Sequence, residues 1–181
     1  MDIELRRLTE NELELMMKWR MREDIANNMF SSVELTIKEQ RKWFKKLQSD
    51  RSQVRWIIFA DNIPIGSMYL VDIDYTNKRC ESGWFVAEKE YRSFKLAMSL
   101  QQNMYDYVFD EMGFNRLCGY ALGINSMLLK LVKLCGMEEE GILRQHIYKD
   151  GIFHDVTVVG LTKDQWQIKK QQFNYNKYFI E

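Results

Sequence analysis

The feature that most restricts the fold is a long amphipathic segment in the middle of the chain, residues 94–112. Apolar side chains recur every fourth residue along it, which places them in one stripe of a helix. Strand-like segments precede and follow it, at 80–86 and 116–122. A helix with one apolar stripe has to bury that stripe against another layer, so we expect a helix packed on a sheet. The stripe consists of Leu96, Leu100, Met104, Val108 and Met112.

Capping signals place three further helices. Threonines at 9, 36 and 162 are each followed three residues later by Glu or Gln, the pattern of a capping box at a helix start. A short helix is expected at 125–135, where Gly136 ends it. Two hairpins are expected at Asp61-Asn62 and Asp150-Gly151, which are favoured turn pairs. The full set of expected strands is 3–8, 54–60, 63–73, 80–86, 116–122, 137–149 and 152–161.

The order of these elements predicts a mixed α/β fold. Strands and helices are interspersed without strict alternation, which indicates a mixed sheet with helices on both faces. The chain has one proline, Pro64, and no Gly/Ser-rich linker, so we expect a single domain over residues 1–181. Residues 167–181 are a C-terminal extension, and its aromatic part, 173–180, is too apolar for water and should pack on the body or on a partner.

Composition excludes several classes of function. The 26 basic residues equal the 26 acidic ones, so overall charge supports neither a nucleic-acid nor a membrane partner. No apolar run approaches the roughly 20 residues of a membrane-spanning helix, and the first residues lack the layout of a signal peptide. Three cysteines without a CxxC pair, and only two histidines, argue against disulfides and against a metal site. We therefore expect a cytoplasmic protein that holds no metal.

The stretch with most chemical content joins the strand at 80–86 to the long helix. A helix N-terminus carries unpaired N–H groups and a partial positive charge, and it therefore suits a pyrophosphate. Arg92 and Lys95 add full positive charges there. An ordinary strand–loop–helix connection with a basic helix start explains this stretch equally well when it is taken alone.

Four other motifs occur in a fixed order around this loop. Glu81-Ser82-Gly83-Trp84 precedes it, and a helix from Asn125 to Met137 follows it. Glu140-Gly141 with Arg144 leads to Asp150-Gly151 and Asp155, and Trp19-Arg20 stands before Ile25 and Met29 near the start. Together with Arg92 to Ala97, they resemble the motifs of GNAT-superfamily N-acetyltransferases. The resemblance covers about residues 3–166. It is strongest to the branch of ribosomal-protein alanine acetyltransferases and of enzymes that acetylate a UDP-linked amino sugar in the pseudaminic acid pathway.

The resemblance implies a mostly antiparallel sheet of about seven strands and acetyl-CoA as co-substrate. Two neighbouring strands would splay apart, and pantetheine would fill the gap before an amine attacks the thioester directly. Glu81 would be the catalytic base, acting through water, although an ion-paired or solvated strand glutamate is the plainer interpretation. Trp19, Arg20 and Met29 would contact the acceptor. The implied coenzyme-binding residues are Trp84, Phe85, Val86, Arg92, Ser93, Phe94, Lys95, Leu96, Ala97, Asn125 and Lys130.

Two positions depart from the family pattern. Lys95 stands where the coenzyme loop has a glycine, so it either adds charge or crowds the loop. Val132 stands where many GNAT enzymes have the tyrosine that protonates the leaving thiolate. Either the thiolate leaves without help, or Tyr91 or Tyr148 substitutes, or the step is impaired. Cys118 and Cys135 lie in apolar runs typical of buried thiols, so a catalytic cysteine is disfavoured.

The acceptor stays open among three hypotheses. The first is the amine of a nucleotide-linked amino sugar, with Arg20 near its diphosphate. The second is a protein N-terminus or a polyamine, for which acidic residues between Glu10 and Asp24 are available. The third, based on Lys95 and Val132, is an acyl-CoA-binding module without catalysis. The expected partner is a small-molecule amine, and a homodimer is left open.

Overall fold

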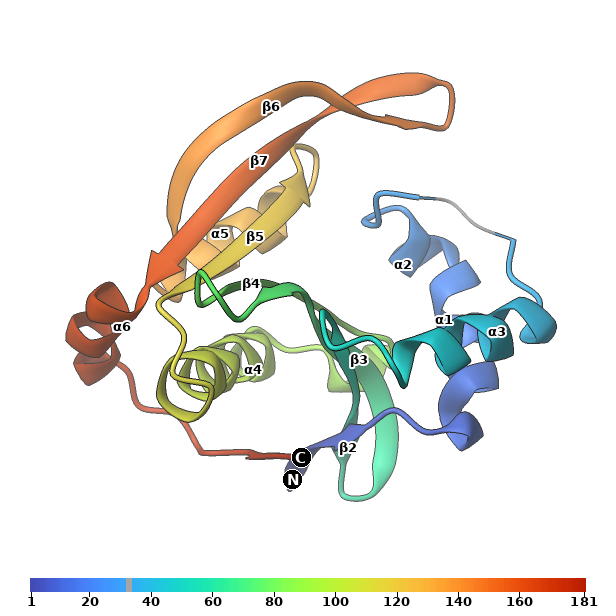
Figure 1. The fold of residues 1–181 in the computed structure, drawn as a ribbon, viewed down its shortest axis with the longest axis horizontal. Helices are drawn as coiled ribbons and strands as arrows, with labels where there is room; N and C mark the ends of the chain where they lie inside the picture. The colour runs from blue at the N-terminus through green and yellow to red at the C-terminus, as the bar shows by residue number, and fades with distance from the viewer. Residues whose placement is uncertain (32–33) are drawn as a thin grey trace.

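One eight-stranded sheet organises the molecule (Figure 1). The computed structural model describes residues 1–31 and 34–181. The strand order across the sheet is β6-β7-β5-β4-β3-β2-β1-β8, and only the β4–β5 and β1–β8 pairs are parallel. The predicted mixed, mostly antiparallel sheet is therefore confirmed, with one strand more than expected. The strands are β1 Ile3–Arg7, β2 Val54–Ala60, β3 Ile63–Asp74, β4 Arg79–Val86, β5 Arg116–Leu122, β6 Glu138–Lys149, β7 Ile152–Thr162 and β8 Phe179–Ile180.

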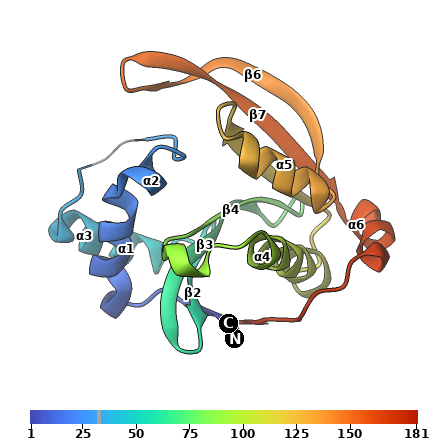
Figure 2. The same cartoon turned by 180° about the vertical axis from the view of Figure 1, so that it is seen from behind.

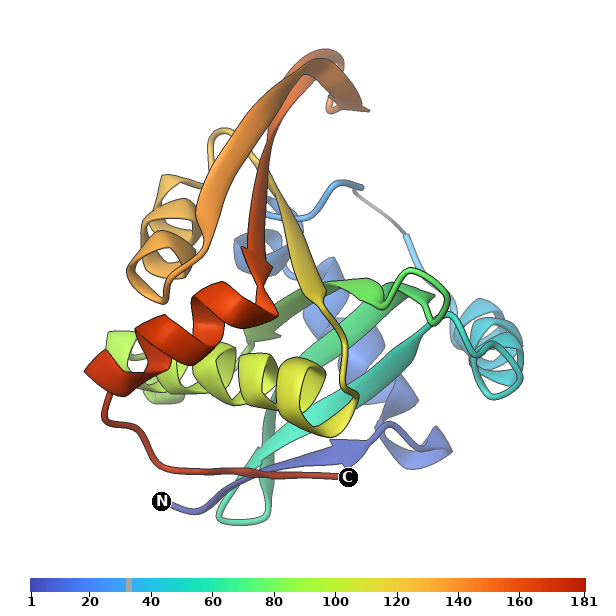
Figure 3. The same ribbon diagram turned by 60° about the vertical axis from the view of Figure 1, so that its left-hand side comes forward.

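Helices cover both faces of the sheet. Figure 3 shows α4 and α6 in front of the strands and α1 behind them, with α3 at the right-hand edge. Figure 2, which views the molecule from behind relative to Figure 1, shows α5 lying next to α4. The helices are α1 Leu13–Met21, α2 Glu23–Ala26, α3 Ile37–Leu47, α4 Phe94–Asp106, α5 Ser126–Leu134 and α6 Lys163–Lys169. Short 3₁₀ turns lie at Glu10–Glu12, Lys89–Tyr91 and Lys170–Gln172, and a π-helical turn at Tyr107–Glu111 follows α4.

Alternation along the strands divides the core into two layers. On β2, Trp56 and Ile58 face the layer formed with α4, α5 and α6, whereas Ile57 between them faces α1 and α3. Val86 and Phe85 divide in the same way at the end of β4. Successive strand side chains point to opposite faces, so a strand buried on both sides supplies two cores at once.

The expected caps fix where the helices begin. Thr9, Thr36 and Thr162 each form the complete capping box that the sequence predicts. Ser93 caps α4 through its side chain, which accepts from the N–H of Leu96. Leu96, Leu100, Met104 and Val108 of the expected stripe are buried. The expected helix over 94–112 is α4 to Asp106 and then the π-helical turn, and Met112 beyond it is half-buried.

The C-terminal extension packs on the body of the protein. Its last strand, β8, runs parallel to β1, and the indole N–H of Trp56 donates to the backbone oxygen of Glu181 at 2.8 Å. Phe173 stacks on Trp166, and the hydroxyl of Tyr175 donates to the buried carboxylate of Asp106 at 2.6 Å. These contacts explain the apolar character of the tail. No helix in the described ranges, 1–31 and 34–181, is long and apolar enough to span a membrane.

Candidate active site

The two central strands separate from each other halfway along their length. β4 and β5 are paired only through Arg79–Arg116, Cys80–Leu117 and Glu81–Cys118. Beyond these pairs, 82–86 of β4 stays bonded to β3, while 119–122 of β5 stays bonded to β7. The edges that face each other across the opening therefore carry backbone groups with no strand partner. Such edges can hydrogen-bond an extended chain inserted between them, as an added strand would do.

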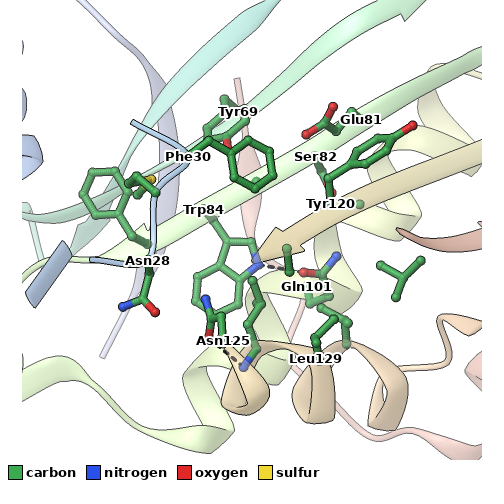
Figure 4. A pocket seen from close by; sticks show the side chains of 18 of the residues that line it. Asn28, Phe30, Tyr69, Glu81, Ser82, Trp84, Gln101, Tyr120, Asn125 and Leu129 are labelled. Carbon is green, nitrogen blue, oxygen red and sulfur yellow. Dashed lines mark hydrogen bonds between the residues drawn. The ribbon is translucent and has the colours of Figure 1, made fainter. Parts of the chain in front are cut away.

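A cleft of about 230 Å³ occupies this opening (Figure 4). Strands β3, β4 and β5 form its floor, the segment after α2 closes one side, and α5 closes the other. Asn125 positions α5, because its side-chain oxygen accepts from the N–H of Leu128 at 3.2 Å and caps the helix beside the cleft. Leu128, Leu129 and Val132 then give this wall an apolar surface.

Glu81 lies at the point where the strands separate, and it lines the cleft. Burial, together with the nearby negative charge of Asp72, raises the pKa of Glu81 to about 7. No ion pair to Glu81 occurs in residues 1–31 and 34–181. The ion-paired interpretation of Glu81 therefore has no support among the described residues, and the role of Glu81 as a base stays a prediction.

Trp84 is held in the cleft floor by a residue that the sequence did not mark. Its indole N–H donates to Oε1 of Gln101 at 2.6 Å, and both side chains line the cleft. Gln101 lies on the sheet-facing side of α4 and is 2% exposed, a position that an apolar residue normally fills. Figure 4 shows Trp84 and Gln101 meeting beneath the opening.

In the loop between β4 and α4, the guanidinium of Arg92 binds other groups of the protein instead of being free to bind an anion. The guanidinium of Arg92 donates to the carbonyl oxygens of Val86 and Ala87, at 2.8 and 2.9 Å. It also donates to Asp24 at 2.6 Å, and Arg22 binds the same carboxylate at 2.9 Å. These contacts hold the pKa of Asp24 well below its usual range. Arg92 thus connects α2 to the end of β4.

The remaining residues predicted for the coenzyme lie in three settings. Phe85 lines the cleft with Trp84 and Asn125, whereas Ser93 caps α4 and Leu96 is buried in the core. Phe94, Lys95 and Lys130 are exposed and are not among the lining residues, and Ala97 is half-buried on α4. The structure therefore brings Trp84, Phe85 and Asn125 to the cleft, whereas Lys95 is exposed in the first turn of α4.

The three residues predicted for the acceptor separate from one another. Met29 lines the cleft beside Asn28 and Phe30. Trp19 is 2% exposed, and its indole N–H donates to Glu88 at 2.6 Å, so it holds α1 against the end of β4. Arg20 lines a second cavity, with Trp43 of α3 and Arg55 of β2.

A known domain model accounts for most of the chain. The acetyltransferase (GNAT) domain model matches residues 2–138, from before β1 to the start of β6. The chain belongs to the GNAT acetyltransferase family. Acetyl-CoA is therefore its acetyl donor, and the reaction class is acetyl transfer to an amine.

Relatives and solved structures agree with GNAT membership. Acetyltransferase PseH of Campylobacter jejuni is 31% identical over 132 residues, which cover 71% of this chain and 80% of PseH. YdaF of Bacillus subtilis, provisionally named a ribosomal N-acetyltransferase, is 24% identical over 127 residues, 70% of this chain and 69% of YdaF. The crystal structure of spermidine N-acetyltransferase from Vibrio cholerae with CoA and spermine has a TM-score of 0.86. At 21% identity over 92% of this chain and 98% of the other, that likeness shows the fold alone.

The GNAT cleft fits an extended thioester ending in phosphates. The open edges of β4 and β5 can receive an amide-bearing arm, and the capped N-terminus of the 13-residue helix α4, with Lys95 beside it, suits phosphate oxygens. When bound, acetyl-CoA supplies an activated carbonyl carbon. Val132 lines the cleft and offers no proton, whereas Tyr69 and Tyr120 are the tyrosines among the described lining residues. Tyr91 and Tyr148 do not line the cleft.

The cysteines of this GNAT domain take no part in the cleft. All three are buried and free. Burial raises the pKa of Cys80 to about 12 and that of Cys135 to about 12, which keeps both as neutral thiols. Among residues 1–31 and 34–181, no three potential metal ligands come together.

Proposed function

We propose that this GNAT enzyme acetylates the primary amine of a nucleotide-linked amino sugar. The family supplies the donor and the reaction class, and the acceptor is our proposal. The motif around Trp19 and Arg20, which resembles that of amino-sugar acetyltransferases, first points to this acceptor.

The observation that carries the proposal is the charge of the cleft. Asp24 and Glu81 are the carboxylates among its described lining residues. Asp24 is already neutralised by Arg22 and Arg92. Glu81 is then the one carboxylate free to meet an ammonium group, which matches an acceptor with a single amine. A polyamine carries several charged amines along its length, and each would need a partner of its own.

The residues of the cleft can divide the work of transfer. An amine is protonated at neutral pH and must lose a proton before it can attack. Glu81, with its pKa near 7, takes that proton through water when it is ionised. Its half-buried position keeps the exchange close to the opening of the strands. No proton needs to come from position 132, because a thiol with a pKa of about 8.5 is a tolerable leaving group as thiolate.

One screen tests the proposal. Thiol release from acetyl-CoA would be followed with UDP-linked amino sugars, spermidine and peptides with free N-termini. We expect the highest kcat/KM with a UDP-linked amino sugar, and loss of that turnover in Glu81→Gln. A higher kcat/KM with spermidine or with a peptide would overturn the acceptor proposal while leaving the reaction class intact.

A further inference from the structure

A second cavity lies between α1, α3 and β2. Met16 and Arg20 of α1, Gln40 and Trp43 of α3, and Arg55 of β2 line it. Glu34, Leu35 and Glu39 complete the described lining. No step proposed for the acetyl transfer uses this cavity.

Unpartnered buried polar atoms gather in this cavity. Nε of Arg20, Oε1 of Gln40 and Nε of Arg55 are buried without a hydrogen-bond partner, and all three residues line it. Among the residues that the structure describes, the one other such atom is the hydroxyl of Tyr105, in the core under α4. Buried polar groups are normally satisfied, so three orphans in one cavity indicate a missing ligand.

The two arginines carry positive charge that the described chain does not balance. Neither Arg20 nor Arg55 forms an ion pair within residues 1–31 and 34–181, whereas Arg22, Arg92 and Arg116 each bind a carboxylate. Burial lowers the pKa of Arg55 to about 10, and the charge of Arg20 contributes in the same direction. A buried cation without a counter-charge is unfavourable, so the site should bind an anion.

The carboxylates at the cavity rim do not fill this role. Glu39 is engaged at the start of α3, where its carboxylate accepts from the N–H and the hydroxyl of Thr36 at 3.0 and 2.7 Å. Glu34 is exposed and forms no ion pair with a described residue. The positive charge of the arginines is therefore available to a ligand.

The side chain of Tyr69 lies between this cavity and the acetyl-transfer cleft. The guanidinium of Arg55 lies 4.4 Å from the ring centre of Tyr69 and 5.3 Å from that of Trp43. Tyr69 itself lines the cleft, where its hydroxyl lies so close to Gly83 that a β-carbon there would be 2.2 Å away. Figure 4 shows Tyr69 at the rear of the cleft beside Glu81. An acceptor with its amine near Glu81 could place a charged group beside the arginines.

We infer that Arg20 and Arg55 form a subsite for a phosphate group carried by the acceptor. Guanidinium groups bind phosphate through two parallel hydrogen bonds, and Gln40 adds an amide for a neighbouring hydroxyl. Trp43 offers a ring face next to the site for a planar base. The phosphate chemistry follows from the cavity, whereas its source in the acceptor rests on the function proposed above.

Titration of inorganic pyrophosphate and of UDP into the CoA-saturated protein tests the subsite, because CoA then blocks the coenzyme phosphates. The variants are Arg20→Met and Arg55→Met. Arg41→Met is the matched control, since Arg41 is an exposed arginine of α3 that points away from the cavity lining. Each buried arginine should be worth about tenfold or more in affinity, as expected for hydrogen bonds to a charged group. The control should bind as the parent protein does.

Steady-state kinetics separate this inference from the proposed function. In both cavity variants we expect KM for a UDP-linked amino sugar to rise at least tenfold, while KM for the free amino sugar stays the same. A parallel rise for both acceptors indicates a packing role and overturns the subsite. Absence of pyrophosphate and UDP binding to the parent protein also overturns it.

Two mixed results remain informative. If pyrophosphate binding depends on the arginines but no amino-sugar nucleotide is acetylated, the proposed function fails and the acceptor as source of the phosphate is overturned with it. If amino-sugar nucleotides are acetylated equally well by all variants, the function stands and the subsite is overturned. Thermal unfolding of each variant identifies any that has not folded, and the other arginine then decides.

Discussion

At position 81 burial raises the pKa of one carboxylate, and the proposed role of Glu81 as a base then predicts how turnover depends on pH. With the pKa of Glu81 near 7, turnover should rise as the pH increases through about 7 and level off above it, because only the ionised form accepts a proton. General-base help is typically worth about 10²–10⁴-fold, so we expect Glu81→Gln to lower kcat at least tenfold. Calorimetry should show unchanged acetyl-CoA affinity. Full activity in this variant would leave solvent as the proton acceptor.

The neighbouring carboxylate provides a control for that profile. The negative charge of Asp72 contributes to the raised pKa, so Asp72→Asn should shift the pH profile of turnover to lower pH without abolishing it.

The contribution of Glu81 to the free energy of unfolding has the opposite dependence on pH. The folded carboxyl holds its proton more tightly than the unfolded one, whose pKa is 4.5. The resulting stabilisation is complete below pH 4.5 and disappears as the pH rises through about 7, a slope that Glu81→Gln should remove.

Lys95 is exposed in the first turn of α4, two residues after the cap Ser93. We expect Lys95→Gly to weaken acetyl-CoA binding and to reduce the dependence of that binding on salt, because a charge near the phosphates is lost. Lys163→Gly makes the equivalent change in the first turn of α6, away from the cleft, and should leave binding unaltered. Tighter binding in Lys95→Gly would show instead that the lysine crowds the loop.

Gly66 is required by the close approach of two strands. A β-carbon at this position would lie 2.2 Å from the backbone oxygen of Phe85, a residue of the cleft. Backbone has to move to relieve such a clash, so Gly66→Ala should lower the free energy of unfolding by about 2 kcal/mol or more. Gly141→Ala has no heavy atom within 4 Å of its new carbon and should change stability by less than about 0.5 kcal/mol. Chemical denaturation of both variants measures the difference.

At the level of elements, the β6–β7 hairpin holds the segment that closes the cleft. Lys149, at the end of β6, is 6% exposed, and its ammonium donates to the carbonyl oxygens of Ala26, Asn27 and Met29 at 2.8 to 3.1 Å. These carbonyls belong to the last residue of α2 and to the segment after it, and the C-terminal end of a helix attracts a cation. One lysine therefore fixes the side of the cleft that carries Asn28 and Phe30.

Lys149→Met should release that side. We expect faster hydrogen exchange in residues 25–30 and a KM for the acceptor raised several-fold, because the segment that carries Asn28 and Phe30 loses its anchor. Stability should fall by about 1.5–3 kcal/mol, the range for hydrogen bonds to a charged group. Lys45→Met, on the exposed face of α3, serves as the control. Unaltered exchange would mean that α2 holds its place without the hairpin.

The sequence predicts those helices and turns that are marked by interactions between residues close together in the chain. Capping boxes at Thr9, Thr36 and Thr162 and the turn pair Asp150-Gly151 are interactions between near neighbours, and all of them are present in the structure. The four-residue helix α2 and the two-residue strand β8 leave no periodic pattern to detect. β8 in addition depends on β1, at the other end of the chain.

The residues of the cleft can likewise be divided into those that a sequence motif marks and those that it does not. Glu81, Trp84 and Asn125 belong to motifs, and the structure places all three in the lining, although their roles stay predictions. Gln101 reaches the cleft because α4 crosses beneath β4, and Tyr69 reaches it because β3 lies beside β4. Neither residue stands in a motif, so its place depends on the packing of distant segments.

At the scale of the whole molecule, residues 175–181 connect β1, β2 and α4. Trp56, Asp106 and Arg7 all bind groups of 175–181 through hydrogen bonds. Removal of residues 173–181 should lower the melting temperature by several degrees, because each lost buried hydrogen bond is worth about 1 kcal/mol. The acetyl-transfer cleft lies elsewhere in the sheet, so the kcat of the truncated protein at low temperature should be retained. Scanning calorimetry and an activity assay at that temperature measure both effects.

The position of β8 also has a consequence during synthesis. β1 leaves the ribosome before β8, and its outer hydrogen-bonding groups then lack the strand that covers them in the folded protein. An uncovered edge strand is a template for pairing with another chain, which leads to aggregation. The opposite edge, β6, is interrupted by two bulges and carries Glu138, Glu139 and Glu140, features that discourage such pairing. The nascent chain is therefore exposed to misassembly at one end of its sheet until residues 179–180 are made.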